Sequence, residues 1–232
     1  MFHLGERLQT VAAMVPPCHT MADIGTDHGY VPAYLALSGQ CHRVIASDIA
    51  KGPCQAAEET RDRYHLHNKM EIRTAPGLKG LRTGEAEAVV IAGMGGATMI
   101  RILEESPEVA ATVPTFVLQP MNAADLLRQW LTHHGYRIAE EALCKENDHI
   151  YAILKAVHTE GTQALTPLEA ELGPYILEDK PALWVEYIQG KAEHYRRLLH
   201  QMEASPAAMN SNKYENLKKL LWQVDELINK SV

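Results

Sequence analysis

The stretch Asp23-Ile-Gly-Thr-Asp-His-Gly29 begins inside the short apolar run Thr20-Met-Ala-Asp-Ile24, which is typical of a β-strand. An acidic residue at a strand end, followed by spaced glycines, indicates a loop that holds a cofactor. Gly25 allows a tight turn and a close approach of ligand to backbone, because glycine has no Cβ atom. In a doubly wound sheet, such a ligand lies beyond the carboxyl ends of the strands. Taken alone, the stretch fits equally well a simple glycine turn in which Asp23 is a capping residue.

Short apolar runs alternate with helix-length segments from residue 19 to residue 158. Strands are predicted at 20–24, 43–47, 70–74, 88–92, 115–118, 136–143 and 150–157, and helices at 32–38, 52–64, 97–103 and 123–133. Repeated strand–helix units predict a parallel sheet that is covered on both faces. The last two strands are joined by a short polar turn at 145–149, so we expect an antiparallel hairpin at one edge. The expected fold class is therefore α/β, a Rossmann-like doubly wound sheet of seven strands.

The pattern becomes helical after the polar segment 159–163. Apolar residues recur about every 3.5 positions from Trp184 to Met202 and again from Tyr214 to Ile228. Two such helices with a short link predict an antiparallel hairpin of the coiled-coil type, although plain packing of the two stripes is the simpler explanation. We expect a first domain at residues 1–160 and a helical domain at residues 161–232.

Two further strand ends carry residues suited to the same ligand. Asp48, followed by Ile49, ends the second predicted strand, where a carboxylate accepts hydrogen bonds from ribose hydroxyls. The run Gly93-Met94-Gly95-Gly96 follows the fourth strand. Glycines cost conformational entropy, so three of them in four positions indicate a backbone that approaches a cofactor or a substrate. The alternatives are a helix cap for Asp48 and a tight turn for the glycines.

The segment Leu118-Gln-Pro-Met-Asn122 follows the fifth strand and faces the same predicted cleft. Gln119 and Asn122 supply neutral hydrogen-bond donors and acceptors, and Pro120 makes the loop rigid. We expect these three residues to contact the substrate, with a capping role for Asn122 as the alternative.

Composition excludes several classes of protein. The formal net charge is −7, which argues against sequence-independent coating of nucleic acid but leaves room for a local basic patch. The sequence contains no run of 18 or more apolar residues, so no membrane span is predicted. The four cysteines are far apart in the sequence, so we expect reduced thiols, a cytoplasmic location and no metal site.

The chain resembles the bacterial tRNA (adenine-22-N1)-methyltransferase family, which uses S-adenosylmethionine. The matching pieces are Leu8-Gln-Thr-Val-Ala12, Met21-Ala-Asp-Ile-Gly-Thr-Asp-His-Gly-Tyr30, Ile91-Ala-Gly-Met-Gly-Gly96 and Leu118-Gln-Pro120. The combination of D-I-G-T-D-H with I-A-G-M-G-G is highly specific, and the resemblance runs over essentially the whole chain. It implies a Rossmann-like domain that binds S-adenosylmethionine and a helical coiled-coil domain that helps to hold tRNA.

The resemblance also implies roles for individual residues. Those assigned to the cofactor are Asp23, Gly25, Thr26, Asp27, His28, Gly29, Asp48, Ile49, Gly77, Leu78, Gly93, Met94 and Gly95. One departure lies after the third strand, where the family has a G-D-G-like run and this chain has Pro76 in place of the acid. The backbone of Gly77 and Leu78 is then expected to hold the adenine of the cofactor, or binding is weaker.

The chemistry expected of this family needs little from the protein beyond alignment. Adenine N1 has a lone pair and attacks the sulfonium methyl group directly, so positioning is the main contribution. The product base is cationic, and Asp27 is our candidate for stabilising that charge, with His28 and Tyr30 as orienting groups. For the RNA itself we name two basic patches. The first is Arg61, Arg63, Lys69 and Arg73, and the second, on the predicted helical hairpin, is Arg196, Arg197, Lys218 and Lys219. Each such patch is more often an ordinary solvated surface.

Two other functions fit the same sequence. A small-molecule methyltransferase would use the helical hairpin as a lid or a dimer contact, and the acidic net charge favours this mildly. An inactive binding module that keeps only the fold is favoured by Pro76 alone. The oligomeric expectation is a monomer or a weak dimer.

Overall fold

The chain divides into two units, Met1–Ala164 and Leu165–Val232, in the computed structural model, which describes residues 3–231. The division falls just after the polar segment 159–163, where the composition of the sequence changes.

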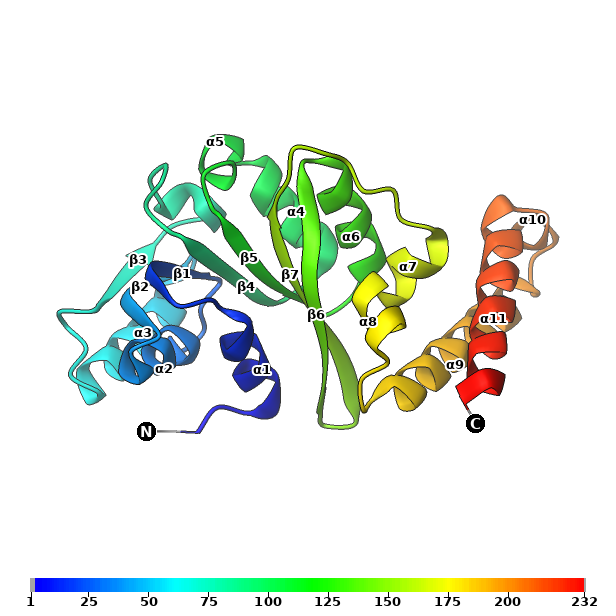
Figure 1. Cartoon of the computed structure of the whole chain (residues 1–232), viewed down its shortest axis with the longest axis horizontal. Helices are drawn as coiled ribbons and strands as arrows, with labels where there is room; N and C mark the ends of the chain where they lie inside the picture. The colour runs from blue at the N-terminus through cyan, green and yellow to red at the C-terminus, as the bar shows by residue number, and fades with distance from the viewer. Residues whose placement is uncertain (1–2, 232) are drawn as a thin grey trace. The chain divides into compact units, whose positions relative to one another are not determined.

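The first unit is built on a sheet of seven strands in the order β3-β2-β1-β4-β5-β7-β6 (Figure 1). The strands are β1 (Cys18–Ile24), β2 (Cys41–Asp48), β3 (Met70–Thr74), β4 (Ala88–Met94), β5 (Thr115–Pro120), β6 (Tyr136–Glu146) and β7 (His149–His158). Strands β1 to β5 pair in parallel, whereas β7 is antiparallel to both β5 and β6. The predicted doubly wound sheet with an antiparallel edge hairpin is therefore confirmed.

Alternate residues of the central strands point into two separate cores, one on each face of the sheet. In β4, Ala88 and Val90 belong to one core, while Val89 and Ile91 belong to the other. Because both faces are covered, these strands read as continuous apolar runs and not as alternating ones. The first core packs against α1 (Glu6–Met14), α2 (Tyr30–Ser38) and α3 (Lys51–Arg63), and the second against α4 (Gly96–Glu104), α5 (Pro107–Ala110) and α6 (Ala124–His133).

Several elements differ from the sequence-based prediction. Helix α1 was not predicted, and neither was the short 3-10 helix η1 (Gly77–Gly80). The turn between β6 and β7 consists of only two residues, Asn147 and Asp148, and not of 145–149. Both have positive φ, as a tight type I′ hairpin turn requires, so the flanking charged residues can continue the ladder.

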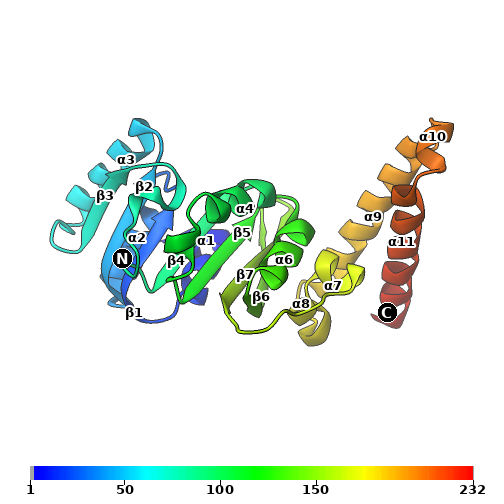
Figure 2. The same cartoon turned by 90° about the horizontal axis from the view of Figure 1, so that it is seen from above.

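The second unit is entirely helical. Its helices are α7 (Pro167–Leu172), α8 (Pro174–Asp179), α9 (Trp184–Met202), α10 (Pro206–Met209) and α11 (Asn212–Ser231). Helices α9 and α11 lie side by side (Figure 2). The Trp184 indole donates to Ser231 at 3.2 Å, which joins the start of α9 to the end of α11, so the pair is antiparallel as predicted. Its coiled-coil character stays a prediction.

Candidate active site

A cavity of about 380 Å³ lies at the carboxyl end of β1 in the first unit. Its lining residues are Arg7, Leu8, Asp23, Gly25, Thr26, Asp27, His28, Gly29, Tyr30, Val31, Ala92 and Gly93. They come from α1, from the end of β1, from the loop that follows it, from the start of α2, and from the end of β4. The structure thus gathers the opening loop and Gly93, at the end of β4, around one space, as expected where parallel strands end together.

Backbone hydrogen bonds hold the loop after β1 in place. The amides of Gly25 and Thr26 both donate to the carbonyl of Ser47 at the end of β2, at 2.8 and 3.0 Å. The Thr26 hydroxyl accepts from the amide of Gly29 at 3.1 Å. Gly25 has φ +79°, and a Cβ atom there would lie 1.9 Å from the terminal methyl group of Met94. The positive φ favours glycine at this position, and any side chain would also have to displace the flexible end of Met94.

Asp23 is the buried acid of the cavity. Its exposed fraction is 8%, and burial raises the pKa of its carboxyl to about 6, against the opposing effect of a hydrogen bond with the Thr26 side chain. A buried carboxylate that the protein stabilises so weakly costs free energy when it is ionised. It is suited to pair with a cationic group of a ligand that enters the cavity.

Replacing Asp23 by Asn is expected to change how stability depends on pH. Because the pKa of Asp23 in the folded protein, about 6, lies above the ordinary value of 3.8 for this group, wild type loses stability as pH rises between these values. The loss amounts to about 3 kcal/mol, which the variant avoids because it has no charge to bury. Chemical denaturation at pH 4 and pH 7 measures this difference. If the stabilities of the two proteins changed with pH in the same way, burial of Asp23 would not be raising the free energy of its ionised form.

Asp27, His28 and Tyr30 form the exposed edge of the cavity. The Asp27 carboxylate lies 3.4 Å from Nε2 of His28, and its side chain is 81% exposed. The His28 ring stacks on the Tyr30 ring with 5.1 Å between the centroids and 11° between the planes. The three predicted catalytic residues are therefore adjacent, with one acidic and two flat side chains at the entrance.

The predicted ribose and adenine residues lie beside the cavity but do not line it. Asp48 directly follows Ser47, which is paired with Ile24 across the sheet, and one of its oxygens accepts from the amide of Ala50 at 2.7 Å. This contact makes a turn before α3, while the helix cap itself is Ala50. Ile49 is 71% exposed.

Gly77 and Leu78 belong to η1, which follows β3. The Leu78 side chain is completely buried in the second core. The Leu78 side chain therefore cannot face a ligand, and contact of Gly77 and Leu78 with the cofactor through their backbone stays a prediction. Pro76 precedes η1 and accepts a hydrogen bond at its carbonyl from the Lys79 amide at 3.1 Å, so the residue that departs from the family pattern is compatible with a regular turn.

The loops after β4 and β5 are tied to each other. The Gly96 amide donates to the carbonyl of Asn122 at 3.0 Å, and a Cβ atom on Gly96 would lie 2.3 Å from the carbonyl oxygen of Ala123. A Cβ atom on Gly95 would lie 2.8 Å from the side-chain oxygen of Asn122. Gly96 thus has a packing reason that the sequence did not reveal, whereas the atom nearest Gly95 is the end of a side chain that can move. Asn122 does not cap α6 through its side chain, because the residue at that position is Ala123.

Gln119 is completely buried and links three segments. Its side-chain oxygen accepts from the Gly93 amide at 3.1 Å and from the Arg7 guanidinium at 2.7 Å, while its amide nitrogen donates to the Pro120 carbonyl at 3.1 Å. Gln119 therefore fixes the residues around it, and its hydrogen-bonding capacity is largely used inside the protein.

Sequence analysis missed Arg7, which lines the cavity from α1. It lies just before the run Leu8–Ala12 that carries part of the family resemblance, and this proximity was the only signal available. Its partners are on β5 and β6, more than 100 positions away in the sequence, so pattern analysis could not place it.

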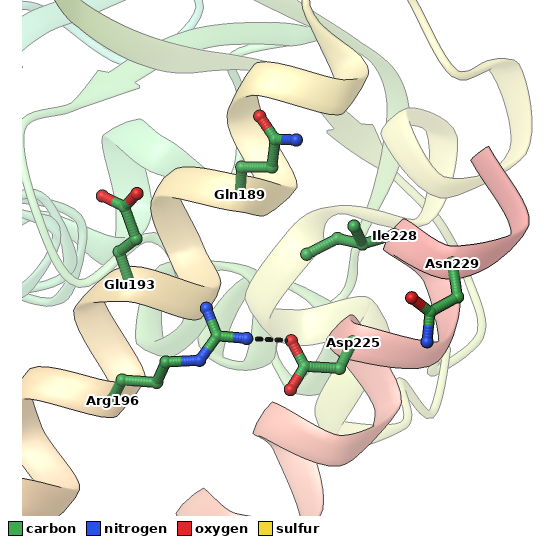
Figure 3. A pocket seen from close by; sticks show the side chains of 6 residues that line it. All are labelled: Gln189, Glu193, Arg196, Asp225, Ile228 and Asn229. Atoms are coloured by element: carbon green, nitrogen blue, oxygen red, sulfur yellow. Dashed lines mark hydrogen bonds and ion pairs between the residues drawn. The ribbon is translucent and has the colours of Figure 1, made fainter. Parts of the chain in front are cut away.

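The predicted RNA-binding arginines are not part of the cavity. Arg61 and Arg63 are in the last turn of α3, and Arg61 pairs with Asp62 at 3.0 Å. In the second unit, a cavity of about 650 Å³ lies between α9 and α11 (Figure 3). Across it, Arg196 pairs with Asp225 at 2.5 Å. Several basic groups of the candidate patches are thus neutralised by neighbouring acids.

A methyltransferase-domain family model matches residues 4–154, which is more than half of the chain. The tRNA (adenine(22)-N(1))-methyltransferase of Bacillus subtilis (strain 168) is 30% identical over 230 residues, which cover 97% of each chain. The chain belongs to this methyltransferase family.

Solved structures agree with this membership. The B. subtilis m1A22 tRNA methyltransferase TrmK is 29% identical, with a TM-score of 0.87 over 98% of this chain and all of that one. The M. capricolum TrmK, solved with S-adenosyl-homocysteine, is 25% identical, with a TM-score of 0.83 over 98% of this chain and 99% of that one. The fold and the family recognised from the opening loop are therefore confirmed.

The described part of the chain contains no group of three or more His, Cys, Asp or Glu side chains arranged to hold a metal ion. Among residues 3–231, no helix combines the length and the apolar character that crossing a membrane requires.

Proposed function

We propose that this protein transfers the methyl group of S-adenosylmethionine to N1 of adenine 22 in tRNA, in the cytoplasm. Full-length similarity to the B. subtilis enzyme of that name supports the reaction and the substrate. The observation that carries the proposal is the cavity at the end of β1, where a buried carboxylate, Asp23, lies beside the glycine loop. These groups fit the cofactor, since an acid for its ammonium group and an open backbone loop are present together.

S-adenosylmethionine supplies an electrophilic methyl group on a sulfonium centre. The loop from Asp23 to Gly29 holds the methionine end, and Asp48 with the exposed Ile49 receives the ribose and one face of the adenine. Backbone of Gly77 and Leu78 borders the adenine, while Thr26, Gly93, Met94 and Gly95 complete the border.

The substrate adenine enters at the edge formed by Asp27, His28 and Tyr30. Adenine N1 is hidden within a base-paired stem, so the nucleotide has to be unpaired or turned out to reach the cavity. The flat surfaces of His28 and Tyr30 can stack against it, and Asp27 faces the positive charge that develops on the methylated base. Pro120 and Asn122 do not line the cavity, and of the two only Asn122, exposed just after β5, is open to contact with the substrate.

The second unit supplies the remaining tRNA contact in this proposal, together with Arg61 and Arg63 on α3. The exposed edge of Arg63 is open to a phosphate, whereas Arg61 has to exchange its partner Asp62 for one. Contacts of this kind release counterions, so binding of tRNA is expected to weaken steeply with salt.

A small-molecule methyltransferase is the second candidate. The specific observation in its favour is that Arg61 and Arg196, from two candidate RNA patches, are both paired with acids.

Incubation with labelled S-adenosylmethionine and either unmodified tRNA or a tRNA-free metabolite extract separates the two candidates. We expect label in tRNA and none above background in the metabolites. Label in the metabolites alone would replace the proposed function by the second candidate. A wild-type protein that binds no cofactor in calorimetry would instead be an inactive module.

A further inference from the structure

Cys18 and Cys41 lie opposite each other at the start of two neighbouring strands. Each is the first residue of its strand, β1 or β2, and the two are in register in this parallel pair. Their sulfur atoms are 3.5 Å apart, and both are free thiols. Folding therefore brings together two cysteines that are 23 positions apart in the sequence.

The backbone at this position can accommodate a disulfide. Neighbouring strands lie about 4.8 Å apart, within the range of about 4.4–6.8 Å that separates the Cα atoms of bonded cysteines. Both side chains face the same core, because Cys41 belongs to it and Cys18 packs against it. The sulfur atoms have to approach by about 1.5 Å to reach bonding distance, which rotation of the two side chains supplies while the strands stay in place.

The two thiols differ in exposure and in acidity. Cys18 is half-buried, whereas Cys41 is completely buried. The hydrogen bond between them lowers the pKa of Cys18 and raises the pKa of Cys41, so the Cys41 thiol donates to the Cys18 sulfur. Burial and the nearby Glu87 carboxylate act against the lower pKa of Cys18. Cys18 is therefore the thiol that meets a dissolved oxidant and reacts as a thiolate, with Cys41 directly behind it.

The other two cysteines provide internal references for oxidation. Both are buried. The Cys54 thiol donates to the backbone carbonyls of Asp48 and Arg73, at 3.6 and 3.4 Å. Burial raises the pKa of Cys144 to about 11. A buried thiol that stays protonated reacts slowly with an oxidant, so we expect both to be inert.

We propose that Cys18 and Cys41 form a redox-modification site that hydrogen peroxide oxidises to a disulfide. The Cys18 thiolate attacks one peroxide oxygen, the O–O bond breaks, and Cys18 becomes a sulfenic acid as hydroxide leaves. The Cys41 sulfur then attacks the Cys18 sulfur, so the S–S bond forms and the S–O bond breaks. The Cys41 proton leaves with that oxygen as water, and the proton first released by Cys18 converts the hydroxide to water. The two thiols lose two electrons, and the peroxide gains them.

Cys41 has a protective effect in this chemistry. By resolving the sulfenic acid it keeps Cys18 on the reversible part of the oxidation pathway, from which a dithiol restores both residues. The pair lies at the first residues of β1 and β2, whereas the cavity lies at the carboxyl end of β1. The site is therefore separate from the one proposed for methyl transfer.

Peptide mass spectrometry of reduced, full-length wild type after treatment with hydrogen peroxide tests the proposal. Both cysteines fall in one tryptic peptide, residues 8–43, so the disulfide appears as this peptide lighter by two hydrogen atoms. We expect dithiothreitol to reverse the change. Cys54 and Cys144 in the same samples should be oxidised at least about 10-fold more slowly.

Two variants separate the roles of the thiols. Cys41→Ser removes the resolving thiol, so Cys18 should gain two oxygen atoms as a sulfinic acid that dithiothreitol does not reverse, about 10-fold more than in wild type. Cys144→Ser makes the same change at a buried cysteine of β6 and should behave like wild type.

Three results would overturn the proposal. They are wild-type Cys18 and Cys41 that stay reduced in peroxide, a disulfide that forms no faster than Cys54 and Cys144 are oxidised, and equal amounts of sulfinic acid at Cys18 in wild type and Cys41→Ser. The first two are measured on wild type alone, so they decide the matter even where a variant fails to fold.

Discussion

Replacing Asp27 by Asn is expected to lower kcat for tRNA methylation by about 100-fold, the size of effect seen when one charge-stabilising group is removed from an active site. Asn has the same shape but cannot oppose the positive charge that forms on the methylated adenine. Asp27 lies at the exposed edge of the cavity, with its carboxylate 3.4 Å from Nε2 of His28. Its side chain is 81% exposed, so it contributes little to the fold and is free to face a substrate.

Single-turnover rates at saturating tRNA, together with the Kd of S-adenosylhomocysteine, measure this effect. The Kd should change by less than about 3-fold, because the charge acts on the transition state and not on the bound cofactor. Glu108→Gln on α5 makes the same carboxylate-to-amide change at an exposed position away from the cavity, and should leave kcat unchanged. A normal rate for Asp27→Asn would exclude an electrostatic role for this residue.

Replacing Arg128 by Met is expected to destabilise the protein by about 3–5 kcal/mol, because it leaves a charge buried without its partner. Arg128 on α6 donates from Nε to Glu141 on β6 at 2.7 Å, and both side chains are completely buried. The pair connects a helix of the second core to the edge hairpin. Urea unfolding followed by circular dichroism measures the change.

Two further variants distinguish the cost of an unpaired buried charge from the cost of lost packing. Combining Arg128→Met with Glu141→Met removes both charges and should recover most of the lost stability, since an apolar pair of similar volume replaces an ion pair at little cost. Arg43→Met breaks an ion pair with Glu71 in which both side chains are 42% exposed, and should cost less than about 1 kcal/mol. A double variant as unstable as Arg128→Met alone would show that lost packing, and not an unpaired charge, is responsible.

The fold was predictable because its central strands are recognisable from the sequence as short apolar runs. The run Ala88–Ala92 is apolar throughout, and the structure buries it between two cores. The short helices were missed for different reasons. Helix α7 has a capping box, in which the side chains of Thr166 and Glu169 each bond to the other's backbone, and Pro167 follows the cap. That signal is present in the sequence and is sufficient to predict the start of the helix.

Only those parts of the candidate site that lie within one short stretch of the sequence were predictable. The loop from Asp23 to Gly29 keeps its expected position because its glycines and the bond from the Gly29 amide to the Thr26 hydroxyl are specified within a few residues. Its two bonds to Ser47 join it to the adjacent strand β2. Arg7 could not be found in this way, since its role depends on Gln119 and Glu146, which folding brings together from distant segments. The packing role of Gly96 against Ala123 likewise depends on a long-range approach of two loops.

The central claim, methyl transfer to adenine N1 in tRNA, is tested most directly by mapping the product on matched transcripts. Unmodified tRNA with adenine at position 22 and the same transcript with guanine at that position would each be incubated with the protein and S-adenosylmethionine, then digested and analysed by mass spectrometry. We expect 1-methyladenosine at position 22 of the first transcript and no methylation of the second. Equal methylation of both transcripts, or none of either by a protein that binds the cofactor, would contradict the proposal.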